Sequence, residues 1–222
     1  MTKKLFIEAI TKYLLGLLLV GLLLFIPGTI KYYNGWLLMG LLFIPMFIAG
    51  IYLMIKNPKL LKIRLNAKEK ETEQKEVLLL SGIMFITGFV VAGLNYRYNW
   101  IILPNIVVII SSIIFIISYI LYGAVLRENT YLSRTIEVDT NQKLIDTGLY
   151  SIVRHPMYMV TLLLFLSIPL ILNSIISFII FLAYPFIIIK RINNEEKVLE
   201  KDLKGYEKYK KKVKYKLIPY IW

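Results

Sequence analysis

The chain contains four apolar runs that are each long enough to cross a lipid bilayer. They cover residues 5–26, 36–55, 77–94 and 101–126. A helix of about 20 apolar residues crosses the hydrocarbon core. Hydrophobic residues make up 58% of the chain, more than a soluble domain carries. No cleavage site of small residues follows the first run, so we expect a retained helix rather than a signal peptide. The sequence therefore predicts an all-α, polytopic bundle of transmembrane helices with four full spans.

A fifth apolar run, residues 159–189, is too long for one span and predicts a helical hairpin. As one straight helix it would extend roughly 46 Å, against a hydrocarbon core of about 30 Å. Asn173 and Ser174 interrupt the run, with Pro169 and Pro185 on either side of them. We therefore expect two helices of about 21 to 23 Å that turn at residues 173–174. That length leaves open whether the hairpin crosses the bilayer or packs inside the bundle.

The lysines and arginines indicate which way the bundle faces. Of 27 basic residues, 25 flank the predicted helices on one side, and 11 of these lie between residues 190 and 216. The positive-inside rule assigns that side to the cytoplasm. Both termini are expected there, in the plasma membrane if the organism is bacterial. The net charge of +13 then serves orientation and contact with anionic membrane lipids, and nucleic-acid binding is not expected.

No repeat, flexible linker or low-complexity stretch divides the chain. We expect one integral membrane domain over residues 1–222, in which 1–130 form the transmembrane scaffold and 131–222 carry the functional residues. A cytoplasmic amphipathic helix is expected after the hairpin, because apolar residues recur at helical spacing between 199 and 206. Cysteine is absent and there is a single histidine, so thiolate and multi-histidine metal sites are excluded and no metal is expected.

The stretch 148–158, Gly-Leu-Tyr-Ser-Ile-Val-Arg-His-Pro-Met-Tyr, contains His155, the only histidine. Pro156 fits the first turn of a helix, where its missing N–H is not needed. The free N–H groups of such a turn attract a carboxylate or phosphate, here beside Arg154 and His155. Taken alone, the stretch is more often an interfacial cap, in which Arg154 contacts lipid phosphates and His155 caps the helix.

The segment after the hairpin favours a ligand-binding role for residues 148–158 over that of an interfacial cap. Arg191 and Glu195 lie four residues apart and share a helix face, which alone would be an ordinary ion pair on an interfacial helix. The hairpin, however, returns them to the side of the membrane on which His155 begins it. An imidazole, basic and acidic groups and several tyrosines converge there, so we expect a polar pocket.

Four blocks of this region resemble the isoprenylcysteine carboxyl methyltransferase (ICMT) family in order and spacing. They are residues 148–158, 191–199, 205–209 and 217–219, within roughly 142–222. The combination of Arg-His-Pro-Met-Tyr with a later double glutamate is a specific pattern. The resemblance implies a membrane methyltransferase that uses S-adenosyl-L-methionine (SAM), without a Rossmann sheet, to methylate a lipophilic small molecule or a lipidated substrate.

The resemblance also implies the residues of the site. Arg191, which would face the methyl acceptor, and Glu196 are the implied catalytic residues. The implied cofactor wall consists of Gln142, Lys143, Leu144, Ile145, Tyr150, Arg154, His155, Pro156, Met157, Tyr158 and Glu195. Gln142 stands where eukaryotic members have a histidine. Arg154, His155 and the helix start suit the carboxylate of SAM. Glu195 or Glu196 suits its ribose hydroxyls and ammonium, and tyrosine faces suit its sulfonium cation.

The chemistry of the acceptor decides between reaction types. A carboxylate is ionised at neutral pH and needs no general base, whereas an amine would need His155 or a glutamate to remove its proton. We therefore expect carboxyl O-methylation, with N-methylation of a phospholipid or amine as an alternative. A membrane NADPH-dependent reductase of the sterol-reductase type and a non-catalytic lipid-binding module are further alternatives. The reductase is less favoured, because no Gly-x-Gly-x-x-Gly motif or added arginine cluster is present.

Overall fold

The computed structural model describes residues 3–66, 72–133, 138 and 142–222, and every regular element within these ranges is helical. The elements are α1 (Lys3–Phe25), α2 (Tyr33–Lys56), α3 (Pro58–Leu65), α4 (Thr72–Tyr98), α5 (Asn105–Glu128), the 3-10 turn η1 (Gly148–Ser151), α6 (Pro156–Ile171), α7 (Ile175–Phe181), α8 (Tyr184–Asp202) and α9 (Tyr206–Lys212). For the described part of the chain, the prediction of an all-α fold is confirmed.

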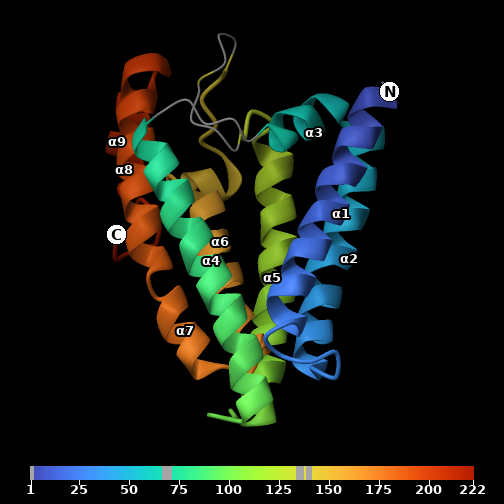
Figure 1. Cartoon of the computed structure of the whole chain (residues 1–222). Coiled ribbons are helices and arrows are strands. Elements are labelled where there is room, and N and C mark those ends of the chain that lie inside the picture. Colours follow the sequence, from blue (N-terminus) through green and yellow to red (C-terminus); the bar gives the residue numbers. More distant parts are fainter. Residues whose placement is uncertain (1–2, 67–71, 134–137, 139–141) are drawn as a thin grey trace.

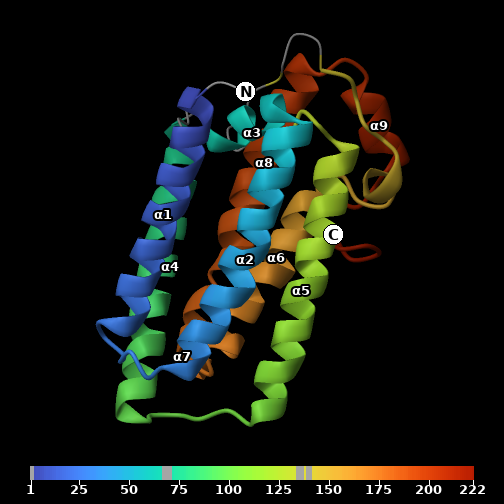
Figure 2. The same cartoon turned by 90° about the vertical axis from the view of Figure 1, so that its right-hand side faces the viewer.

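The four predicted spans correspond to α1, α2, α4 and α5, which run roughly side by side (Figures 1 and 2). Helix α5 begins four residues later than predicted, because Pro104 disfavours helical backbone in the residue before it. By length and composition, five helical stretches of the described chain are apolar enough to cross a membrane: these four helices and Ile175–Asp202. Many of their large apolar side chains are exposed, as lipid-facing surfaces require.

The fifth run forms the two antiparallel limbs of a hairpin, α6 and the pair α7–α8. The turn lies at the predicted residues 173–174. Asn173 has a positive φ of 57°, and the side chain of Ser174 caps α7 by accepting from the Ser177 N–H at 3.2 Å. The return limb breaks at residues 182–183, before Pro185, because a proline there cannot donate to the carbonyl four residues earlier.

Helix α4 fastens the return limb to the scaffold. Ser177 of α7 donates to the carbonyl of Gly88 at 2.9 Å. A Cβ atom on Gly88 would lie 2.3 Å from the Phe181 ring, so only glycine lets the two helices come this close. This contact sets the position of α4 relative to α8, with which it also packs.

The N-terminus, α3, the end of α8 and α9 lie at one end of the bundle (Figures 1 and 2). The predicted amphipathic helix is divided in two: α8 ends at Asp202, and α9 starts after Gly205, whose φ of 89° ends regular helix. The segment after α9 turns back alongside the bundle, where Leu217 is buried in the main core.

Candidate active site

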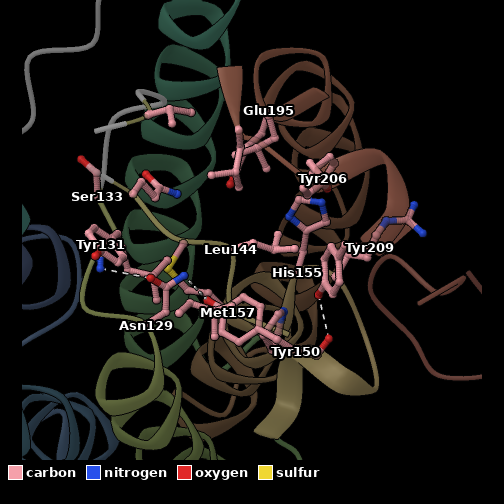
Figure 3. Close-up of a pocket in the computed structure, with 18 of the residues that line it drawn as sticks. Asn129, Tyr131, Ser133, Leu144, Tyr150, His155, Met157, Glu195, Tyr206 and Tyr209 are labelled. Atoms are coloured by element: carbon pink, nitrogen blue, oxygen red, sulfur yellow. Dashed lines mark hydrogen bonds between the residues drawn. The ribbon is translucent and has the colours of Figure 1, made fainter. Parts of the chain in front are cut away.

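A pocket opens at the end of the bundle that holds α9. The residues that line it are Asn129, Tyr131, Leu132, Ser133, Val138, Gln142, Lys143, Leu144, Ile145, Tyr150, Arg154, His155, Pro156, Met157, Tyr158, Arg191, Glu195, Leu199, Leu203, Tyr206 and Tyr209. In Figure 3, His155, Tyr206 and Tyr209 lie on one side and Asn129, Tyr131 and Ser133 on the other. The space between these walls, its open mouth included, is about 830 Å³.

The pocket brings together nearly all of the residues that the sequence singles out. All eleven residues implied for the cofactor line it, and so does Arg191. Glu196 is not among the lining residues. The loop residues Asn129, Tyr131 and Ser133 join the wall although no sequence pattern pointed to them.

Arg191 and Glu195 meet the start of α6 through Tyr158. The Arg191 Nε donates to the Tyr158 hydroxyl at 2.8 Å, and this hydroxyl donates to the Glu195 carboxylate. The guanidinium also lies 5.8 Å from the centre of the Tyr158 ring. Tyr158 therefore connects the cation and the carboxylate of α8 and fixes both at the pocket wall.

Helix α4 contributes to this network through Gln74, which belongs to none of the sequence motifs. Its Oε1 accepts from Nη1 of Arg191 at 3.3 Å, and the side chain is completely buried. Gln74 stands at the start of an apolar run, where a polar residue normally marks no more than the membrane interface. Sequence alone gave no signal for this contact.

Glu196 lies behind the wall and holds the segment after α9 in place. Its carboxylate accepts from Arg154 Nε at 2.7 Å, lies 3.3 Å from His155 Nε2 and pairs with Lys216 Nζ at 3.2 Å. Arg154 also donates through Nη1 to the carbonyls of Val213 and Lys214, both at 2.8 Å. Arg154 and Glu196 thus neutralise each other in a buried, hydrogen-bonded cluster, and most of the Arg154 donors have protein partners.

The backbone of the motif is paired with the same segment. The N–H groups of Arg154 and His155 donate to the carbonyls of Tyr215 and Lys216, both at 2.9 Å. Pro156 begins α6, as predicted, and His155 occupies the position before it. The His155 side chain makes no capping hydrogen bond and instead lies beside Glu196 and the Tyr158 ring. Its role in this fold is therefore not that of an ordinary helix cap.

Three tyrosines of the pocket are held as neutral phenols. Burial raises the pKa values of Tyr150, Tyr206 and Tyr209 above their ordinary value. Tyr209 donates to the Tyr150 carbonyl at 2.7 Å, and Tyr206 donates to Glu196 at 3.3 Å. These residues supply aromatic surface and hydrogen bonds rather than a base. Among the described residues, no group of three or more acidic or histidine side chains is placed to hold a metal ion.

The comparison with known families bears on this geometry. Residues 107–201 match the model of the isoprenylcysteine carboxyl methyltransferase (ICMT) family. The resemblance inferred from the sequence is thereby confirmed for this part of the chain. The match runs from α5 to the end of α8 and contains the whole 148–158 motif, Arg191 and both glutamates. The ICMT-matched stretch thus supplies most of the pocket, whereas α4, α9 and the segment after it lie outside.

One relative has a name that describes a different activity. Delta(14)-sterol reductase TM7SF2 of Mus musculus is 28% identical over 117 residues, which cover 47% of this chain and 28% of that protein. The chain therefore spans well under two thirds of the length of this relative.

Proposed function

We propose that this protein is a membrane-embedded, SAM-dependent methyltransferase that methylates the carboxylate of a lipophilic or lipidated acceptor. The observation that carries the proposal is the pocket, which residues of the ICMT motif line together with Arg191 and Glu195. Its place at the end of a bundle with apolar outer faces suits an acceptor delivered from the membrane.

The polar groups of the pocket fit SAM. His155 and the start of α6 suit its carboxylate, because the first turn of a helix presents N–H groups and partial positive charge. Glu195 suits the ribose hydroxyls or the ammonium, and the rings of Tyr150, Tyr206 and Tyr209 suit a sulfonium. When bound, SAM would supply an electrophilic methyl group for the acceptor oxygen, with S-adenosylhomocysteine as the leaving group. The protein orients both partners and excludes water.

Arg191 is the residue proposed to hold the acceptor. A guanidinium binds a carboxylate through two parallel hydrogen bonds, and that carboxylate is already ionised at neutral pH. An amine acceptor would need a base, yet Tyr158 donates to Glu195, and Arg154 and Lys216 neutralise Glu196. These partners favour O-methylation over N-methylation. They also give Glu196 a positioning role in this proposal, in place of the catalytic role implied by the resemblance.

The charge pattern supports a cytoplasmic site. The end of the bundle with α3, α9 and the pocket (Figure 1) is the end at which 25 of 27 basic residues are expected. The positive-inside rule favours the cytoplasm for such an end. We propose that the site and both termini face the cytoplasm, at the plasma membrane if the organism is bacterial. Anionic lipids would surround this rim.

A membrane NADPH-dependent reductase is the second candidate, favoured by the similarity to the sterol reductase. Titration calorimetry in detergent separates the two. The methyltransferase proposal expects S-adenosylhomocysteine (SAH) to bind and NADPH not to bind. Binding of NADPH without SAH would overturn it in favour of the reductase.

A further inference from the structure

Only one of the two polar side-chain atoms of Gln74 has a hydrogen-bond partner. Its Oε1 accepts from Arg191 Nη1 at 3.3 Å, but its Nε2 is buried without any acceptor. A buried N–H group without a partner is costly, and native proteins rarely keep one without a reason. The side chain is 0% exposed, so bulk water does not satisfy this donor either.

A second buried amide nitrogen without a partner belongs to α8, the helix that carries Arg191. Among the described residues, the buried side-chain atoms without a hydrogen-bond partner are Nε2 of Gln74 and Nδ2 of Asn194. Asn194 follows Arg191 by three residues on α8, which places the two on neighbouring positions of one helix side. One of these two donors thus belongs to a side chain that contacts the guanidinium, and the other belongs to the residue three positions after Arg191.

We infer that Gln74 is a specificity-determining residue that, together with Arg191, receives the carboxylate of the methyl acceptor. This inference rests on the proposed function and adds a residue from α4, outside the stretch that matches the family. Through Oε1, Gln74 fixes the direction of Nη1 of Arg191. Through Nε2, it donates to an acceptor oxygen when the substrate is bound.

The chemistry of these groups selects an anion. A guanidinium and an amide N–H are donors, so an anionic oxygen satisfies both and an ammonium satisfies neither. Gln74 also begins the apolar part of α4, at the edge of the expected hydrocarbon region, and exposed Leu78 and Leu79 follow it. An acceptor with an acidic head and a hydrocarbon tail would place its head at Gln74 and its tail in lipid.

A substitution that keeps one function of Gln74 and removes the other tests the inference. Gln74→Glu still offers an oxygen to Arg191 but replaces the N–H donor with a negative charge. With N-acetyl-S-farnesyl-L-cysteine as the probe, we expect its KM to rise at least tenfold, while the Kd for SAH stays within twofold. Gln74→Leu, which removes both functions, should raise KM and lower kcat. Glu76→Gln is the matched control, because Glu76 lies two residues along α4 in an exposed ion pair with Lys190.

The amide of the same probe gives the second arm. As competing ligands, the acid should bind the wild type at least tenfold more tightly than the amide, and Gln74→Glu should lose this preference. If Gln74→Glu keeps the wild-type KM and the preference for the acid, Gln74 does not bind the acceptor and the inference is wrong, while the methyltransferase function stands. A wild-type protein that does not bind SAH contradicts the proposed function itself, and the inference falls with it.

Discussion

The hydroxyl of Tyr158 lies 2.8 Å from Nε of Arg191, so the first turn of α6 and the middle of α8 meet at one hydrogen bond. Tyr158→Phe keeps the ring under the guanidinium but removes the hydroxyl that orients Arg191 and donates to Glu195. Hydrogen bonds to charged groups contribute about 1.5–3 kcal/mol. We expect kcat/KM for the farnesylated probe to fall by about tenfold to a hundredfold. Tyr220→Phe is the control, since that side chain is 86% exposed. Equal activity of the two variants would remove Tyr158 from the mechanism.

Glu195 and Glu196 are adjacent in sequence, but their substitutions should have different effects. Glu196→Gln leaves the buried Arg154 without its counter-charge, which costs about 3–5 kcal/mol of stability when one partner is removed. Glu195→Gln keeps a hydrogen-bonding side chain at the pocket wall and should mainly weaken SAH binding. Thermal unfolding in detergent and SAH calorimetry separate the two effects. Normal stability of Glu196→Gln combined with lost turnover would instead give Glu196 a direct catalytic role.

The segment after α9 should be required for cofactor binding. A chain that ends at Val213 lacks the carbonyls of Tyr215 and Lys216 that pair with the backbone of Arg154 and His155. We expect the Kd for SAH to rise more than tenfold and the Tm to fall. Removal of residues 1–4, which lie far from the pocket along the chain, should leave SAH binding unchanged. If the shortened chain binds SAH normally, the segment is only an attachment to the bundle.

The topology can be read from single cysteines, because the native chain has none. Lys212→Cys on exposed α9 should react with a membrane-impermeant maleimide only after the cytoplasmic side is opened. Ile102→Cys, 68% exposed at the other end of the bundle, should react on intact cells. The reverse pattern would place the site on the outer face, contrary to the positive-inside prediction.

The sequence predicted those parts of the fold that depend on local composition. Apolar length gave the helices, and Pro156 and residues 173–174 gave the start and the turn of the hairpin. Even the deviations are local in origin: Pro104 delays α5, and Gly205 separates α9 from α8. Each is a backbone preference that overrode the apolar periodicity.

The composition of the site was predictable only in part, because its motif residues occur in one stretch while their partners do not. Arg154 and Glu196 were both assigned to ligand chemistry, yet they neutralise each other. Gln74 contacts a residue 117 positions away, and this depends on how α4 packs against α7 at Gly88. No local pattern records a contact that is set by the packing of two distant helices.

The pairing of the 148–158 motif with the segment after α9 also has a consequence for how the protein is made. Arg154 cannot form its hydrogen bond to the Lys214 carbonyl until Lys214 has been synthesised, 60 residues later. At 5–20 residues per second, this delay is roughly 3 to 12 s. Helices α1 to α5 can enter the bilayer during that time. The pocket, however, stays open on one side until the hairpin has formed and the segment after α9 has left the ribosome. The newborn protein is thus a membrane-inserted bundle before its pocket is complete.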